Sequence, residues 1–190
     1  MSVANSEAEI HWRSFIEQLQ ARGLRGMQLV TSDDHSGIKA ALAATMPSVP
    51  WQRCQFHLQQ NTTHYVSKLV LRKEVAEDIR GIFRARNETD ARLHLGDFIE
   101  KYTDSEPRLA EWAAENLPEG LAVFGIPAPH RRRMRTSNAV ERINKEIKRR
   151  TRVAGLFPNE ASLLRLVTAL AMEVSEEWET GRTYLTIKPR

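Results

Sequence analysis

GMQLVTSDDHSG, residues 26–37, is the stretch of the sequence that decides the fold. Met27–Thr31 is a short apolar run, which predicts a β-strand, and the polar residues after it predict a turn. Residues 6–23 before this strand and residues 38–46 after it both repeat apolar side chains at helical spacing. The segment WQRCQF, residues 51–56, predicts a second short strand or a strand-to-helix junction. A helix, a strand and a helix in succession are typical of α/β proteins rather than of helical bundles.

The middle of the sequence is helical throughout. Residues 58–116 show no strand-like alternation, and four helices can be drawn there, at 58–69, 72–85, 88–102 and 106–116. A connector rich in Pro and Gly follows, and then two more predicted helices, at about 138–150 and from Glu160 to about Trp178. We therefore predict an α/β fold that is mostly helical, divided into residues 1–57, 58–130 and 131–190.

The composition is that of a globular protein, with 27% charged and 41% hydrophobic residues in a chain of 190. No apolar run approaches the roughly 20 residues of a membrane helix. The N-terminus lacks the basic and apolar regions of a secretion signal. Cys54 is the only cysteine, which excludes an internal disulfide and fits a reducing compartment. We therefore expect a cytoplasmic protein with no membrane partner.

Positive charge is concentrated in one segment. Residues 130–152 contain ten Lys and Arg against two Glu, whereas the rest of the chain contains 18 basic and 22 acidic residues. A dense basic segment on an otherwise acidic protein indicates contact with a polyanion, for which nucleic acid is the leading candidate. A basic face that is simply solvated, with no ligand, is the alternative. Under the first interpretation the DNA-binding side chains are Arg135, Arg142, Lys145, Lys148, Arg149 and Arg150.

Asp33 is a candidate metal ligand because it follows the predicted strand closely. Functional side chains of open α/β sheets gather beyond the carboxyl ends of the strands. Mg²⁺ prefers oxygen ligands and usually takes one or two carboxylates from the protein. Asp34 and His35 compete for the role, although Asp33 is nearest to the strand end. The alternative is that Asp33 only stabilises the turn and caps the following helix.

Glu141 is a second candidate, near the start of the predicted helix in the basic segment. With Asn138 as the N-cap, Glu141 would stand at the third helical position, where a carboxylate stabilises a helix without any metal. The basic residues around it argue for a further role. A carboxylate beside a phosphate-binding face is what metal-assisted phosphodiester chemistry requires, because the metal activates water and neutralises charge on the phosphate.

Cys54 and His57 are spaced as a Cys-x-x-His pair. Tetrahedral zinc needs four protein ligands, or three with an open position. No suitable partner follows the pair, since His64 stands seven residues beyond His57. We therefore favour a core cysteine, with a histidine that orients a neighbouring group, over a structural zinc site.

Three segments together resemble the Mutator-type transposases of bacterial insertion sequences: VTSDDHSGIKAAL (30–42), WQRCQFH (51–57) and RTSNAVERINKEIKRRTRVAGLFPNEASLLRLV (135–167). The resemblance implies a ribonuclease-H-like catalytic core, interrupted by a helical insertion, in which three acidic residues (a DDE set) bind two divalent metal ions. It implies that Asp33 and Glu141 are the second and third of these residues, catalytic and ligands of Mg²⁺ or Mn²⁺. Cys54 and His57 match the family's Cys-x-x-His signature, with an orienting role.

The same resemblance divides the chain by role. Residues 1–57 are expected to form part of the ribonuclease-H-like core, and residues 58–130 the helical insertion and its connector. Residues 131–190 are expected to complete the core with the basic helix and the C-terminal helix. The expected partner is double-stranded DNA, at the ends of the element and at its target, with a second copy of the chain as a further candidate.

One departure from the family pattern limits the expected activity. The family's first catalytic Asp lies on an earlier strand, and no Asp precedes Asp33 in this sequence. A complete enzyme would catalyse the cutting and strand-transfer steps of DNA transposition. With one ligand missing, we expect a C-terminal transposase fragment with weak or no metal binding and no in-line cleavage by itself. Two alternatives remain, a non-catalytic DNA-binding or multimerising remnant and a decayed product without function.

Overall fold

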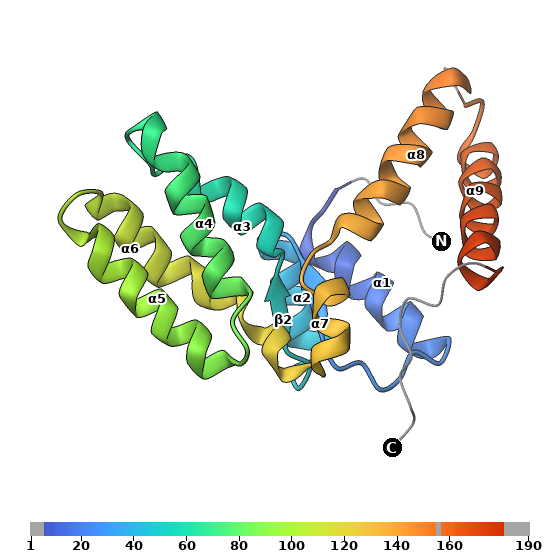
Figure 1. Cartoon of the computed structure of the whole chain (residues 1–190). Helices are drawn as coiled ribbons and strands as arrows, with labels where there is room; N and C mark the ends of the chain where they lie inside the picture. The colour runs from blue at the N-terminus through green and yellow to red at the C-terminus, as the bar shows by residue number, and fades with distance from the viewer. Residues whose placement is uncertain (1–5, 155–156, 181–190) are drawn as a thin grey trace. The chain divides into compact units, whose positions relative to one another are not determined.

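The computed structural model describes residues 6–154 and 157–180, and the chain forms two compact units. One unit comprises Ala8–Thr136, and the other is formed mainly by the residues from Ser137 onward. The two units are described separately. Both are dominated by helices, and the strands lie in the first unit (Figure 1).

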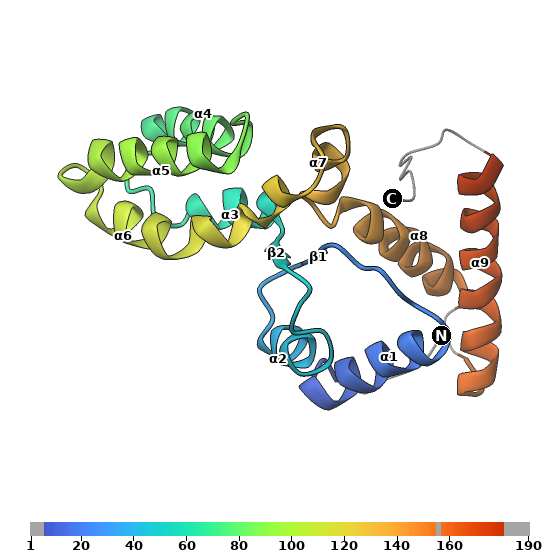
Figure 2. The same cartoon turned by 90° about the horizontal axis from the view of Figure 1, so that it is seen from below.

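A small parallel β-sheet organises the start of the first unit. Strand β1 (Val30–Ser32), helix α2 (Ser36–Thr45) and strand β2 (Trp51–Arg53) follow one another, and the two strands pair side by side (Figure 2). Parallel strands need such a crossover, because a short hairpin can join only antiparallel ones. The predicted strand at 27–31 is thus confirmed in type but lies slightly later in the chain. In register, Val30 pairs with Trp51 and Ser32 with Arg53.

Helix α1 (Glu9–Ala21) packs on α2 through its apolar face. Ile16 is buried in this contact, and the two helices enclose a small core of their own. The chain then reaches β1 through Gly23 and Gly26, whose φ angles of 100° and 67° lie in the left-handed region that glycine adopts at little cost. The succession of helix, strand and helix predicted for this part of the chain is confirmed.

Strand β2 runs directly into helix α3 (Gln55–Thr62), with Cys54 between them. The predicted junction is confirmed, but the predicted helix at 58–69 is wrong at both ends. Beyond α3 the chain leaves the helical path, and the buried side chain of Val66 joins the main core. Ser67 then donates from its hydroxyl (2.6 Å) and its N–H (3.0 Å) to the carboxylate of Glu106. Tertiary packing has overridden local helical propensity here.

Three helices form the bulk of the helical block between β2 and Arg135: α4 (Arg72–Phe83), α5 (Glu88–Thr103) and α6 (Pro107–Asn116). Their predicted bounds are confirmed to within two residues. Each helix buries residues at helical spacing, so that α4 and α5 form one layer over α3 and α6 (Figure 2). The largest fully buried side chains of this core are Leu58, Val75, Ile79, Ile82, Leu109, Leu117, Leu121 and Val123.

The chain returns to the sheet through two 3₁₀ turns, η2 (Leu117–Gly120) and η3 (Ala122–Gly125), and helix α7 (Ala128–Met134). The Thr31 hydroxyl on β1 donates to the carbonyl oxygen of Met134 at 2.6 Å. The N–H of Gln55, at the start of α3, donates to the carbonyl oxygen of Arg135 at 3.0 Å. The helical block therefore begins and ends at the same edge of the sheet.

The second unit is a helical hairpin of α8 (Asn138–Ala154) and α9 (Glu160–Thr180). An ion pair joins the two helices, in which both terminal nitrogens of Arg150 lie 3.0 Å from the carboxylate oxygens of Glu173. Across the described ranges, no helix has the length and apolar character to cross a membrane. The prediction of an α/β fold that is mostly helical is confirmed.

Candidate metal centre and basic helix

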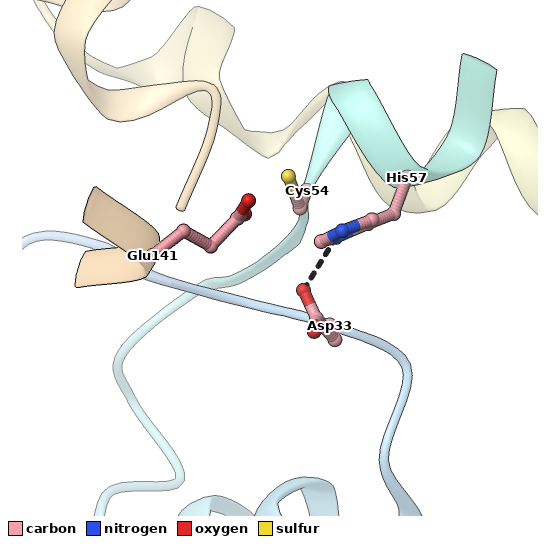
Figure 3. A group of neighbouring side chains, drawn as sticks. All are labelled: Asp33, Cys54, His57 and Glu141. Carbon is pink, nitrogen blue, oxygen red and sulfur yellow. Dashed lines mark ion pairs between the residues drawn. The ribbon is translucent and has the colours of Figure 1, made fainter. Parts of the chain in front are cut away.

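Asp33 and His57 form an ion pair at the carboxyl end of the sheet. The Asp33 carboxylate, one residue beyond β1, lies 2.6 Å from Nδ1 of His57 in the first turn of α3 (Figure 3). The Asp33 side chain is 62% exposed and that of His57 is 25% exposed. A histidine in contact with a carboxylate can fix the orientation of that carboxylate and still leave it accessible to solvent. The pair thus leaves Asp33 accessible while limiting its rotation.

The neighbours that compete with Asp33 have other partners. The two carboxylate oxygens of Asp34 contact Lys39 (3.2 Å) and Arg53 (3.1 Å). His35 is the N-cap of α2, and its Nδ1 accepts a hydrogen bond from the Gly37 N–H at 3.2 Å. The alternative role of Asp33 is wrong in its capping part, because His35 occupies the N-cap position, whereas a role of Asp33 in the turn stays a prediction. Of the three residues in this turn, Asp33 is the one directed to His57.

Arg53 holds this turn in place, and the sequence did not indicate its role. Its side chain is only 5% exposed, and one terminal nitrogen lies 3.1 Å from Asp34, 3.1 Å from Glu119 and 2.9 Å from Asn116. A guanidinium can be buried when carboxylates and other acceptors surround it. Arg53 thereby links the turn after β1 to η2 of the helical block. The residues next to Arg53 in the sequence do not indicate that its side chain contacts Asn116 and Glu119.

Lys39 completes the charge cluster. Its ammonium lies 2.9 Å from Glu119 and 3.2 Å from Asp34, and 4.4 Å above the centre of the Trp51 ring. Burial acts to lower the pKa of Lys39, but its hydrogen bonds to Glu119 and Asp34 outweigh burial, so that the pKa is raised. Lys39 therefore stays charged at neutral pH, and it balances the two carboxylates together with Arg53.

Cys54 is a core residue beside the pair. It is fully buried between β2 and α3, and its N–H donates to the Ser32 carbonyl oxygen at 2.8 Å. Its sulfur lies within 4.8 Å of the ligand atoms of Asp33 and His57. Mg²⁺ takes hard oxygen ligands and not a thiol sulfur. The donor set of this unit therefore fits Mg²⁺ through Asp33 alone, with His57 in contact with its carboxylate.

Glu141 is held by the residue that precedes its helix. The Ser137 hydroxyl donates to the Glu141 carboxylate at 2.7 Å, and the Glu141 N–H donates to the Ser137 carbonyl oxygen at 3.0 Å. The expected N-cap role of Asn138 is wrong, since α8 already begins at Asn138. Glu141 belongs to the second unit, where these two contacts fix it in the first turn of α8.

The predicted DNA-binding residues fall into three groups. Arg142, Lys145 and Lys148 are exposed on α8 and have no ion pair within the described parts of the chain. Arg149 and Arg150 both donate to Glu146, at 2.7 to 2.9 Å. These hydrogen bonds, first from Arg149 and then from Arg150, lower the pKa of Glu146 to about 2. Arg135 is not on α8 but follows α7 in the first unit.

The fold and the site together define a mostly helical α/β protein with a carboxylate–imidazole pair at a strand end and a helix with exposed basic residues. Residues 1–181 match the model of the transposase family called Mutator, and the chain belongs to this family. The assignment made from the three sequence segments is thereby confirmed.

Individual proteins similar to this chain are also transposases of insertion sequences. The chain is similar to the transposase for insertion sequence element IS406 of Burkholderia multivorans, with 54% identity over 98% of this chain and 48% of the relative. It is 34% identical to the transposase for ISRM5 of Rhizobium meliloti, over 98% of this chain and 47% of the relative. It is 32% identical to the transposase for IS256 in transposon Tn4001 of Staphylococcus aureus, over 96% of this chain and 47% of the relative. The chain thus spans about half the length of the curated relatives it matches.

Proposed function

We propose that this chain forms part of the catalytic core of an insertion-sequence transposase, with Asp33 and Glu141 as two of three carboxylates of a DDE site. The observation that carries the proposal is the Asp33–His57 pair at the end of a parallel strand, in a member of the Mutator family. The β1–α2–β2 unit is consistent with part of a ribonuclease-H-like core, and α3 to α6 with its helical insertion. The substrate would be double-stranded DNA, at the ends of the element and at its target.

The side chains have distinct parts in this proposal. Asp33 and Glu141 would hold Mg²⁺ or Mn²⁺, which would activate water and neutralise charge on the phosphate. His57 orients Asp33 through the 2.6 Å contact, and Ser137 orients Glu141 through its hydroxyl at 2.7 Å. Cys54 fills the space between strand and helix. Orienting contacts of this kind keep a metal ligand in its productive position.

The chain by itself is proposed to be inactive. The family pattern has its first acidic residue on a strand earlier than Asp33, and residues 1–32 of this sequence contain no Asp. Two metal ions close together need ligands that bridge them, so two carboxylates by themselves are expected to bind the ions more weakly than a complete set of three. Cytoplasmic location and assembly with a second copy of the chain remain parts of the same proposal.

The function can be tested with a chimera of the Burkholderia multivorans relative. In this chimera the present chain replaces the matched part of the relative, which is 48% of that protein. The resulting full-length protein is expected to nick a supercoiled plasmid that carries the element ends, and to require Mg²⁺ or Mn²⁺. The chain alone should give no nicking under the same conditions. Cleavage that persists in the presence of EDTA would contradict the proposed metal mechanism.

DNA binding by α8 gives a second prediction. Replacing Arg142, Lys145 and Lys148 together by Gln should reduce the slope of log affinity against log salt concentration by about 3, because each lost phosphate contact removes about 0.9. The measurement is fluorescence anisotropy of a labelled duplex between about 50 and 200 mM salt. Arg149 and Arg150 remain predicted contacts, although Arg149 would first have to leave Glu146, and Arg150 would have to leave both Glu146 and Glu173.

A matched control has the same loss of charge on other helices. Arg13, Arg80 and Arg92 lie on α1, α4 and α5, and each forms a surface ion pair within its own helix. Their triple replacement by Gln should leave the slope nearly unchanged. Equal losses in the two triple variants would mean that net charge, and not α8, determines binding.

A non-catalytic DNA-binding remnant is the second candidate function. The exposed basic residues of α8 favour it, because contact between them and phosphates needs no metal. This candidate predicts duplex binding that is unchanged by EDTA, and no nicking even in the full-length protein described above. Nicking by that protein would decide for the catalytic function.

A further inference from the structure

A cavity of about 370 Å³ in the first unit is lined by five arginines and no acidic residue. It lies where the end of α4 and the α4–α5 loop meet η3 and α7. The arginines are Arg84, Arg86, Arg131, Arg132 and Arg135. A concentration of like charge in a concave site is costly unless an anion occupies it.

Two of the five arginines already have partners. Arg131 donates to the carbonyl oxygens of Ile126 (2.8 Å), Phe124 (3.0 Å) and Arg86 (2.8 Å), and its guanidinium lies 5.3 Å from the centre of the Phe124 ring. Arg86 forms an ion pair with Asp90 at 3.1 Å. These two residues shape the wall of the cavity, and the charge of Arg86 is partly neutralised.

The remaining three have no such partners. Within the described ranges, the side chains of Arg84, Arg132 and Arg135 neither donate a hydrogen bond to the protein nor form an ion pair. Arg84 and Arg132 are exposed, and Arg135 is half-buried. Burial, and then the charges of Arg84 and Arg132, lower the pKa of Arg135. Three guanidinium groups thus face one cavity without a carboxylate to balance them.

We propose that this cavity, which we call the arginine pocket, binds a phosphate group through Arg84, Arg132 and Arg135. Guanidinium groups match phosphate oxygens in geometry and charge, and several of them converging on one point are typical of phosphate recognition. The pocket has a fixed relation to the candidate metal centre within the same unit, because the Arg135 carbonyl oxygen accepts from the Gln55 N–H, next to Cys54. We therefore assign the phosphate to the backbone of the DNA strand that reaches Asp33, an assignment that rests on the proposed function.

The first test is duplex binding by the Arg84→Gln/Arg132→Gln variant of the full chain. Both side chains are exposed, so the fold should be retained, which circular dichroism can verify. Because the pocket holds one phosphate, the loss of that contact should reduce the slope of log affinity against log salt by about 1. The Arg80→Gln/Arg92→Gln variant removes the same charge from paired surface positions of the same unit, and its slope should be unchanged. Equal slopes in the two variants would overturn the inference.

The second test identifies the source of the phosphate. Modification of arginines by phenylglyoxal, followed by peptide mass spectrometry, should show Arg84 and Arg132 protected by duplex DNA at least fivefold more than Arg92. If inorganic phosphate protects these arginines and duplex DNA does not, the ligand of the pocket is a free phosphate and not the DNA backbone. Protection by neither would overturn the pocket itself.

The outcomes also separate the pocket from the proposed function. If the α8 variant loses duplex binding while the arginine pocket variant keeps it, the pocket assignment fails and α8 stands. If only the arginine pocket variant is weakened, the pocket stands and the DNA-binding role of α8 fails. A third outcome is that the full-length protein nicks DNA, while the α8 variant and the arginine pocket variant both bind duplex as well as the parent chain does. This outcome would leave the catalytic proposal intact and overturn the pocket.

Discussion

Asp33→Asn is expected to abolish Mg²⁺-dependent nicking by the full-length protein, with a loss of about 10³-fold or more. A metal ion contributes several kcal/mol to charge stabilisation in the transition state, and each 1.4 kcal/mol is about tenfold in rate. The substitution keeps the shape of the side chain but removes the charge that would hold the ion. Glu141→Gln should cause a loss of similar size. Initial rates of plasmid nicking at saturating Mg²⁺ measure both.

Asp34→Asn is the matched control for this prediction. It makes the same chemical change one residue further on, where the carboxylate contacts Lys39 and Arg53 instead of His57. Nicking should stay within about tenfold of the parent protein. His57→Gln should cost about 10- to 100-fold, as expected of a residue that orients a metal ligand. Loss of nicking in Asp34→Asn with activity retained in Asp33→Asn would show that the wrong carboxylate has been assigned.

Arg53→Met is expected to lower the free energy of unfolding by about 3 kcal/mol. Removing one partner of a buried ion pair costs about 3–5 kcal/mol, because the other charges are left without compensation. The lower end applies here, since the side chains of Asp34 and Glu119 are 42% and 30% exposed and keep contact with water. Met fills most of the space that Arg53 occupies. Urea unfolding of the chain, followed by tryptophan fluorescence, measures the change.

Arg13→Met provides the comparison for Arg53. Arg13 forms an ion pair with Glu17 at 3.2 Å, but the two side chains are 50% and 57% exposed. Such surface pairs within a helix contribute about 0.3–0.5 kcal/mol. The two arginines should thus differ severalfold in their effect on stability. If Arg53→Met lowers the free energy of unfolding as little as Arg13→Met does, Arg53 does not link the turn after β1 to η2.

Local patterns predicted most of the fold. The helices α4, α5 and α6 repeat apolar residues at a period that depends only on their own geometry, so their bounds could be predicted closely. The position of Asp33 after an apolar run likewise indicated a strand end. Cys54 is buried, as its interpretation as a core residue predicted. The orienting role of His57 stays a prediction, which its 2.6 Å contact with Asp33 supports.

Contacts between distant segments could not be predicted in this way. Arg53 contacts Asn116 and Glu119, more than 60 residues away, and nothing in the sequence around it differs from an ordinary surface arginine. The arginine pocket likewise combines Arg84 with residues of α7. The end of α3 was also missed, because the chain turns there to bury Val66 in a core built by later helices. In each case the partner is fixed by the tertiary fold and not by spacing.

The return of the helical block to the sheet has a consequence for the order of folding. The hydrogen bond from Thr31 to Met134 joins residues 103 positions apart, and the one from Gln55 to Arg135 joins the two ends of the helical block. Contacts of such long range form late, after the intervening helices have packed. During synthesis on the ribosome, the turn that carries Asp33 would thus acquire its final support only after α7 has emerged. The entropy of closing a loop rises slowly with its length, by about 0.6 kcal/mol for each doubling. The helical block could therefore grow or shrink in evolution at little cost to the geometry of Asp33 and His57.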